Sequence, residues 1–350
     1  MAISAPVSRE GGPHSGAIFH APFLSDSFGR RINYVRISIT EHCNFRCVYC
    51  SPAEGTPYFD REDHLKPAEY DRLLQIFASL GVQHVRLTGG EPLIHPGLLD
   101  RVRCAKSAGI PKVSLSTNGY LLDRLAGALA EAGVSRINVS LDSLKADRFT
   151  RITRGGRLER VLAGLDAARR AGIPSIKLNV VLQGKESLDE LPELVDYARQ
   201  HQFDIQFIET MPLGVAGTAI LASDYVSIAA AKQCLERSYR LEPVQSPGDQ
   251  GPARVHRLEG SDIRVGFISP ISENFCSTCN RVRLTAAGRL VFCLGQEAGL
   301  DLMPLLRGDI GDAAIGSVIR EKVWFEKPER HFFNEDQSRS AKVYMMRLGG

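Results

Sequence analysis

The sequence predicts an α/β fold, an incomplete parallel barrel made of six strand and helix repeats. Short β-rich runs alternate with helical stretches from residue 34 onward, and the chain lacks the glycine-rich dinucleotide motif of doubly wound sheets. The expected strands cover residues 34–40, 84–89, 112–117, 136–141, 176–182 and 204–209. The helices between them are expected at 67–80, 97–108, 120–132, 157–172 and 187–201. Functional residues of such barrels gather at the carboxyl ends of the strands, so we expect the site there.

The composition is that of a globular protein, because 43% of the 350 residues are hydrophobic, which is enough to build a core. The formal net charge of +3 is too small to favour nucleic acid binding, and no apolar segment approaches the ~18 residues of a membrane helix. The first residues do not form a signal peptide, so we expect a cytoplasmic protein. We expect a disordered leader over residues 1–20, the barrel over 21–215 and a different C-terminal region over 216–350.

Three cysteines follow the first expected strand. Cys43, Cys47 and Cys50, here called the first cysteine triad, are spaced so that their sulfurs share one side of a compact loop. Three ligands leave one coordination position of a metal centre open, which favours chemistry over a structural role. The alternative is a structural zinc completed by His42 or His64. A disulfide would leave one thiol over.

A second group of cysteines lies near the end of the chain. Cys276, Cys279 and Cys293 form the second cysteine triad, which follows a hairpin expected over 254–258 and 262–268. If 281–285 and 289–293 are strands joined by a three-residue loop, Thr285 pairs with Arg289 and Arg281 with Cys293. This register returns Cys293 to the side of Cys279. A zinc completed by His256 or His331 is an equal alternative on spacing alone.

Basic residues occur where an anion could use them. Arg281 and Arg283 are two residues apart on one expected strand, so they point from the same face about 7 Å apart and could hold neighbouring phosphates. Arg36, Arg86 and Lys177 lie inside otherwise apolar strands, where a buried charge needs a partner. The alternative for each is a solvated side chain.

The first triad, with Tyr49 before its last cysteine and Gly-Gly-Glu-Pro at 89–92, resembles the radical S-adenosylmethionine (SAM) enzymes. The second triad with its arginines narrows the resemblance to the GTP 3',8-cyclase family of molybdenum cofactor biosynthesis. Further matches are the segments 26–30, 116–119, 138–143 and 208–212 and the terminal Gly349-Gly350. Gln206 and the Glu41-His42 pair depart from the family pattern.

The resemblance implies a TIM-like radical SAM core, two [4Fe-4S] clusters and SAM as cofactors. A 5'-deoxyadenosyl radical would remove the C3' hydrogen of GTP, and the carbon radical would attack C8 to give 3',8-cyclo-7,8-dihydro-GTP. The implied SAM-binding residues are Tyr49, Gly90, Ser140 and Met211. The implied GTP-binding residues are Arg36, Arg86, Thr117, Lys177, Arg281 and Arg283, and the tail Gly349-Gly350 would reach into the active site.

The same resemblance implies GTP as substrate, an external one-electron donor and a downstream cyclic pyranopterin synthase, and a homodimer is a further expectation. No Walker motif occurs, which fits a nucleotide held by Arg and Lys side chains. The rival hypotheses are a radical SAM enzyme with an auxiliary cluster that acts on a peptide, and a non-enzymatic iron–sulfur or zinc protein.

Overall fold

The computed structural model describes residues 22–51, 64–244, 251–294, 296, 299–331 and 345–348. Its centre is a run of six parallel strands, each hydrogen-bonded to the next. They are β3 (Tyr34–Ser38), β4 (His84–Thr88), β5 (Lys112–Thr117), β6 (Arg136–Ser140), β7 (Ile176–Val181) and β8 (Asp204–Ile208). All six strands begin at the residue that the sequence predicts. The leader expected over residues 1–20 lies outside the described residues.

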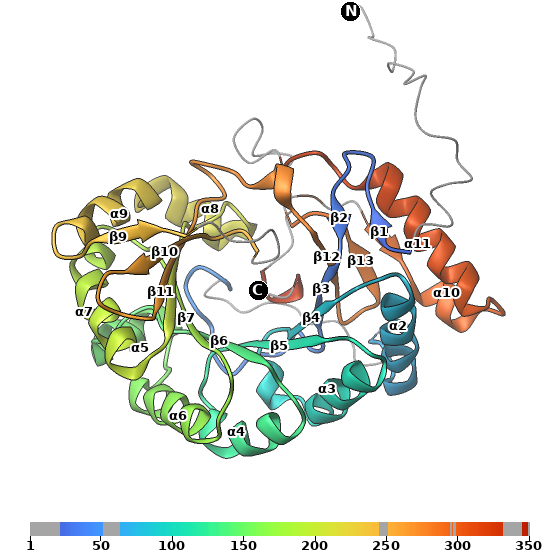
Figure 1. Ribbon diagram of the computed structural model, residues 1–350, viewed down its shortest axis with the longest axis horizontal. Helices are drawn as coiled ribbons and strands as arrows, with labels where there is room; N and C mark the ends of the chain where they lie inside the picture. Colours follow the sequence, from blue (N-terminus) through green and yellow to red (C-terminus); the bar gives the residue numbers. More distant parts are fainter. Residues whose placement is uncertain are drawn as a thin grey trace, which may run out of the picture.

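Helices cover the outer face of this sheet, as Figure 1 shows. They are α2 (Pro67–Ser79), α3 (Leu98–Ser107), α4 (Leu122–Glu131), α5 (Ala146–Thr153), α6 (Leu158–Arg170) and α7 (Glu186–His201). The predicted helices are confirmed, and α5 is an addition to them. In α2, Pro67 occupies the first turn and Glu69 accepts a hydrogen bond from the backbone of Lys66, which caps the helix. Its Leu73 and Phe77 are fully buried, four residues apart on the face that packs inward.

The C-terminal region folds into short elements around the same sheet. Its helices are α8 (Gly214–Ser223), α9 (Ile228–Glu236), α10 (Met303–Arg307) and α11 (Asp312–Glu326), with the short 3-10 turns η3 (Cys276–Thr278) and η5 (Met345–Arg347). Its strands are β9 (Leu241–Pro243), β10 (Arg254–Leu258), β11 (Arg264–Ile268), β12 (Arg281–Leu284), β13 (Arg289–Val291) and β14 (Gly299–Asp301). The remaining elements are β1 (Leu24–Ser25), β2 (Arg31–Ile32) and η2 (Pro92–Ile94).

Two strands of the C-terminal region extend the six-stranded core, one at each edge. β11 pairs in parallel with β8, and β12 pairs in parallel with β3. The full order is β14-β13-β12-β3-β4-β5-β6-β7-β8-β11-β10-β9, which runs as an open arc and supports the predicted incomplete barrel. The C-terminal region therefore shares one sheet with the core, and the domain boundary expected at residue 215 stays a prediction.

Side chains alternate across each parallel strand, so one face packs under the helices and the other lines the barrel interior. Val35, Ile37, Val85 and Leu87 belong to the hydrophobic core, while Arg36 between the first two points to the opposite face. The last described turn, η5, lies in the middle of the arc in Figure 1. The interior is therefore where charged side chains and the C-terminal tail meet.

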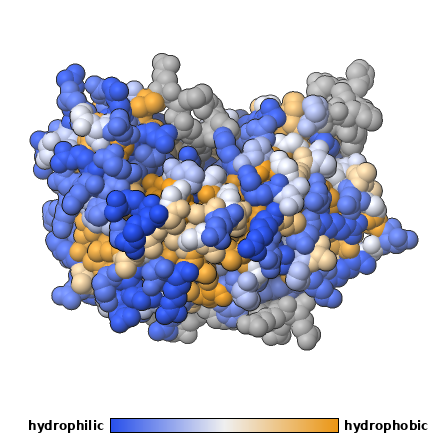
Figure 2. Space-filling model, turned by 60° about the horizontal axis from the view of Figure 1, so that its bottom comes forward, coloured by the Kyte–Doolittle hydropathy of each residue, from blue (hydrophilic) through white to orange (hydrophobic). Residues whose placement is uncertain are grey.

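The outer surface is mixed. Figure 2 shows hydrophilic side chains around smaller apolar areas on the face that lies at the bottom of Figure 1, where α3, α4 and α6 are found. In the described part of the chain, no helix has both the length and the apolar character needed to cross a bilayer.

Candidate functional site

The first cysteine triad lies in the loop that follows β3. The backbone N–H groups of Cys50 and Ser51 both donate to the carbonyl of Cys47 at 3.0 Å, which bends the loop into a tight turn. The N–H of Phe45 points at the Sγ of Cys43 at 3.3 Å. All three cysteines are free and partly exposed. The loop therefore presents the predicted thiols together at the carboxyl end of β3.

The Gly-Gly-Glu-Pro segment after β4 packs directly against this loop. The N–H of Gly90 donates to the carbonyl of Thr40 at 2.7 Å, and that of Glu91 donates to the carbonyl of His42 at 2.8 Å. A Cβ atom on Gly90 would lie 2.1 Å from the His42 carbonyl oxygen, which is far inside van der Waals contact. Only glycine lets the two backbones come this close.

Glu91 joins three segments beneath the cysteine loop. Its buried carboxylate accepts hydrogen bonds from the Thr117 hydroxyl at 2.6 Å, the Asn118 N–H at 2.7 Å and the Leu93 N–H at 2.9 Å. Burial raises its pKa to about 7 against these hydrogen bonds. The Asn118 amide in turn donates to the Asn44 side chain at 2.8 Å, next to Cys43. Thr117, expected to contact GTP, thus has a bond to Glu91, and its role toward a substrate stays a prediction.

Asp142 organises the other residues expected near SAM. The Tyr49 hydroxyl donates to Asp142 Oδ2 at 2.9 Å, and the N–H of Val181 donates to Oδ1 at 2.8 Å. Burial raises the pKa of Asp142 to about 6. Ser140 ends β6 two residues earlier, so Tyr49 and Ser140 lie at the same end of the barrel. Met211 follows β8 and packs with a small apolar group that includes Met345.

The second cysteine triad is assembled by the predicted hairpin. Arg283 is opposite Val291 and Leu284 opposite Leu290, and the N–H of Thr285 donates to the carbonyl of Arg289 at 2.9 Å, so the predicted register is confirmed. Because β12 runs parallel to β3 with Arg281 beside Tyr34, the second triad lies at the amino end of β3. The rule about carboxyl ends of strands therefore describes the first triad and does not extend to the second.

The two triads consequently lie at opposite ends of one short strand. β3 has five residues, which span about 17 Å at the usual rise of a strand. The space between the triads is the barrel interior, lined by the inward side chains of β12, β3 and β4.

Arg30 and Lys327 contact the second triad, and neither belongs to the site predicted from the sequence. Arg30 forms a buried ion pair with Asp26 at 2.6 Å and donates to the Cys276 carbonyl at 2.8 Å. The Lys327 ammonium lies 3.8 Å from Cys279 Sγ. Burial alone would raise the pKa of Cys279, but Lys327 and Arg281 lower it to about 6. The positive charges therefore favour the thiolate of Cys279, the form that binds metals, whereas burial raises the pKa of Cys276.

The donor set of each triad, three free cysteines, fits an iron–sulfur cluster that keeps one iron open. The six thiols are free, and within the described ranges no three His, Cys, Asp or Glu side chains converge on a point where one metal ion could bind. A zinc ion needs all its ligand atoms within about 2.3 Å of a single point. Thiolates around a cluster are bonded to different iron atoms and need not converge in this way. The zinc sites considered with His42, His64, His256 or His331 are therefore not supported.

A row of arginines crosses the barrel interior between the triads. The strand register places Arg36 between Arg283 on one side and Arg86 on the other. Burial and Arg283 lower the pKa of Arg36 well below its ordinary value, and burial and Arg281 lower that of Arg283 to about 10. Like charges on adjacent buried strands repel each other, so this row is suited to a polyanion.

Two further ionisable groups have pKa values to which the charges of the row contribute. Burial would raise the pKa of Tyr34, but four surrounding arginines lower it below its ordinary value. Lys177 on β7 is opposite Asp204, and burial lowers its pKa to about 8 although Asp204 acts in the other direction. The charge of Arg86 in the row also acts to lower the pKa of Lys177, and the role of these residues toward GTP stays a prediction.

The C-terminal tail reaches this row. Arg283 donates to the carbonyl of Leu348 at 3.0 Å, and the Arg347 guanidinium lies 3.6 Å from the buried carboxylate of Glu41, next to the first triad. Gly349 and Gly350, expected to enter the active site, lie outside the described residues. The four residues before them already contact both halves of the site.

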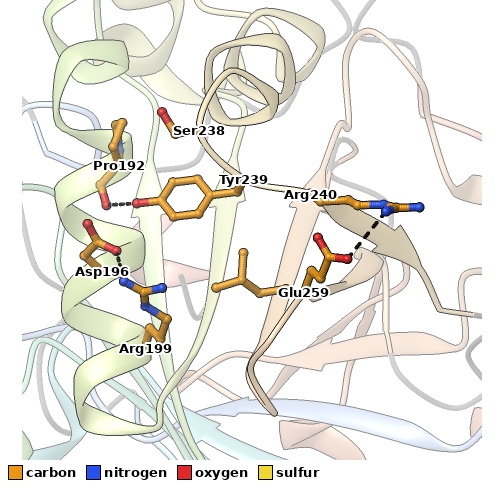
Figure 3. Close-up of a pocket in the computed structure, with 8 residues that line it drawn as sticks. Pro192, Asp196, Arg199, Ser238, Tyr239, Arg240 and Glu259 are labelled. Atoms are coloured by element: carbon orange, nitrogen blue, oxygen red, sulfur yellow. Dashed lines mark hydrogen bonds and ion pairs between the residues drawn. The ribbon is translucent and has the colours of Figure 1, made fainter.

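A hollow of about 490 Å³ lies outside the barrel, between α7 and the segment that leads into β9 (Figure 3). It is lined by Pro192, Asp196, Arg199, Ser238, Tyr239, Arg240, Leu258 and Glu259. Its charged groups pair with one another, Asp196 with Arg199 at 2.8 Å and Arg240 with Glu259 at 3.5 Å. None of the predicted site residues lines it, so the barrel interior remains the candidate site.

Comparisons with known proteins match most of the chain. The family model described as radical SAM superfamily matches residues 37–198, and the model described as Molybdenum Cofactor Synthesis C matches residues 203–333. A GTP 3',8-cyclase of Marinobacter nauticus is 45% identical over 333 residues, which cover 93% of this chain and 98% of that protein. A GTP 3',8-cyclase of Pseudomonas putida strain W619 is 46% identical over 336 residues, with the same coverage.

Among solved structures, the crystal structure of Streptococcus suis SuiB has a TM-score of 0.58 at 14% sequence identity. The match covers 85% of this chain and 67% of that one. At this level of identity the similarity is one of fold.

Proposed function

The chain belongs to the GTP 3',8-cyclase family of radical SAM enzymes, and from this premise we propose that GTP lies in the barrel interior between two [4Fe-4S] clusters, one on each cysteine triad. The reaction is the radical cyclisation of GTP, the first step of molybdenum cofactor biosynthesis. When bound, the first cluster and SAM supply the radical that this cyclisation consumes. The arginine row between the triads is the observation that carries the assignment.

The arginines and Lys177 bind the triphosphate in this proposal. Arg36, Arg86 and Arg283 lie side by side, and each presents a planar fork of donors that matches phosphate oxygens. Arg281 extends the group toward the second triad, where it also stacks over the Phe275 ring at 5.3 Å. Bound phosphates relieve the repulsion between these side chains. The guanine end of GTP then lies toward the second cluster, as the family resemblance implies.

The residues around the first triad bind SAM. Gly90 brings its backbone against the cysteine loop, and Asp142 fixes the Tyr49 hydroxyl. Ser140 and Met211 follow from the family resemblance. These groups orient the cofactor and exclude water, so that the radical is formed close to the C3' hydrogen of GTP.

The C-terminal tail approaches the substrate in this proposal, because Leu348 accepts a hydrogen bond from Arg283. Gly349 and Gly350, which the family resemblance implies in the active site, lie outside the described residues. We also propose an external one-electron donor, a downstream cyclic pyranopterin synthase, a homodimer and a cytoplasmic location, all of which rest on the family alone.

The test is anaerobic incubation of the reconstituted chain with SAM, dithionite and GTP, followed by mass spectrometry of the products. We expect a cyclised nucleotide and one 5'-deoxyadenosine per turnover. Cleavage of SAM without any cyclised nucleotide would contradict GTP as the substrate and favour the alternative of a peptide substrate. The nearly full-length similarity to GTP 3',8-cyclases does not favour that alternative. Iron analysis should give about eight iron atoms per chain, and stoichiometric zinc would exclude radical chemistry.

A further inference from the structure

Lys327 is a buried lysine beside the second cysteine triad, and the function proposed above does not use it. It follows the last residue of α11, and only 2% of it is exposed. Its ammonium donates to the carbonyl of Arg281 at 2.9 Å and to that of Phe292 at 2.7 Å, and lies 3.8 Å from Cys279 Sγ. An ammonium has three donors, and these three acceptors account for all of them.

The ammonium of Lys327 lies next to the Cys279 thiol and pairs with no described carboxylate. In the part of the chain that the structure describes, its ammonium forms no ion pair with an aspartate or glutamate. Burying an ammonium without a negative partner is costly, and two carbonyl dipoles offset only part of that cost. The Cys279 sulfur can supply the missing negative charge, because cysteine binds metal as the thiolate.

The first triad has the opposite surrounding. Burial raises the pKa of Cys43 and of Cys47. The neighbouring carboxylates raise it further, Glu91 for Cys43 and Asp142 for Cys47. The fold therefore gives two sites with the same number of thiols different electrostatic environments. Net charge and hydrogen bonds to the sulfurs are two of the factors that set the reduction potential of an iron–sulfur cluster.

We propose that Lys327 is a positioning residue that raises the reduction potential of the second cluster, by placing its ammonium against the Cys279 thiolate. Reduction adds one electron and one negative charge to the cluster, and a fixed positive charge stabilises the reduced form more than the oxidised one. The proposed function assigns Lys327 no contact with substrate or SAM. The inference rests on the second cluster of the proposed function.

The experiment is a redox titration of the reconstituted full chain, followed by electron paramagnetic resonance, on three variants. Lys327→Met removes the charge at nearly constant volume, and Lys327→Arg retains the charge. Lys322→Met is the matched control, because Lys322 lies on α11 just before Lys327, is 42% exposed and pairs with Glu326. The two signals are assigned with a companion variant in which the first triad is replaced by alanine.

In Lys327→Met we expect the equilibrium constant for reducing the second cluster to fall at least tenfold, which is 59 mV for a one-electron couple. The first cluster should be unchanged in every variant, and Lys327→Arg and Lys322→Met should stay within threefold of wild type. If Lys327→Met does not assemble its cluster, Lys327→Gln replaces it, because the amide still donates to the carbonyls but carries no charge.

A second-cluster potential within threefold of wild type in either uncharged variant would overturn the proposal. So would loss of the second cluster in both uncharged variants with the first retained, since Lys327 would then be purely structural. A wild-type chain that binds only about four iron atoms would instead refute the cofactors of the proposed function, so the two failures are distinguishable.

Discussion

Replacing Arg283 by methionine should weaken GTP binding without lowering the stability of the fold. Burial and Arg281 lower the pKa of Arg283 from 12.5 to about 10. Each pKa unit corresponds to about 1.4 kcal/mol, so a charged Arg283 destabilises the substrate-free fold by about 3 kcal/mol at neutral pH. Its hydrogen bond to Leu348 offsets about 1.5 to 3 kcal/mol of this. The free energy of unfolding of Arg283→Met should therefore stay the same or rise by up to about 1.5 kcal/mol.

GTP binding should respond in the opposite direction. Loss of a buried charged contact to phosphate removes about 2 to 3 kcal/mol, which weakens binding by about 30- to 150-fold. Unfolding is measured by urea titration of the cluster-free chain with circular dichroism, and GTP affinity by anaerobic equilibrium dialysis of the reconstituted chain. Arg257→Met is the control, because Arg257 is an exposed arginine paired with Glu242 at 2.6 Å. It should change neither quantity appreciably.

The reasoning would be refuted by an Arg283→Met chain that loses more than about 2 kcal/mol of stability and still binds GTP within threefold of wild type. Arg283 would then be an ordinary structural residue, and the arginine row would not be an anion site.

Three further changes test the remaining parts of the site. Burial lowers the pKa of Lys177 to about 8, so its positive charge is lost as the pH rises above 8. GTP affinity should then fall by at most about tenfold per pH unit, and Lys177→Arg, which stays charged, should abolish this loss. Gly90→Ala should displace the loop at His42 and reduce bound iron from about eight to about four atoms per chain. Gly127→Ala is the control, because its new methyl group meets nothing within 4 Å, and it should stabilise the chain by about 0.5 to 1 kcal/mol. Arg281→Ala should leave bound iron intact and weaken GTP binding by a few kcal/mol if its contact is buried. Normal GTP affinity at pH 9, full iron in Gly90→Ala or unchanged affinity in Arg281→Ala would contradict the respective assignment.

The parallel core was predictable because its signals are local. Each strand is a short β-rich run, and the period of the next segment changes to that of a helix, so the first residues of all six strands could be placed. The hairpin register at the second triad was predictable for the same reason, since a three-residue loop fixes which residues are opposite each other. Arg36, Arg86 and Lys177 could be singled out because each interrupts an otherwise apolar strand, where a buried charge needs a partner.

Contacts between distant segments were not predictable. Arg30 reaches the carbonyl of Cys276 across 246 residues of sequence, and Lys327 reaches Cys279 from the end of α11. Neither residue interrupts an apolar run or belongs to a spacing that binds metal, so neither periodicity nor cysteine spacing distinguishes it from a surface cation. The pairing of β12 with β3 likewise brings the second triad to the amino end of the barrel, and a rule about carboxyl ends could not anticipate this.

The way in which the C-terminal region borders the core has a consequence for synthesis. When a ribosome has released residues 34–208, the six parallel strands exist but both outer strands, β3 and β8, still expose unpaired backbone groups. β11 covers one of them about 60 residues later, and β12 covers the other only when residue 284 has emerged. A nascent barrel with two open edges can pair with another chain. The last quarter of the sequence therefore removes two edges at which another chain could pair, in addition to carrying the second cysteine triad.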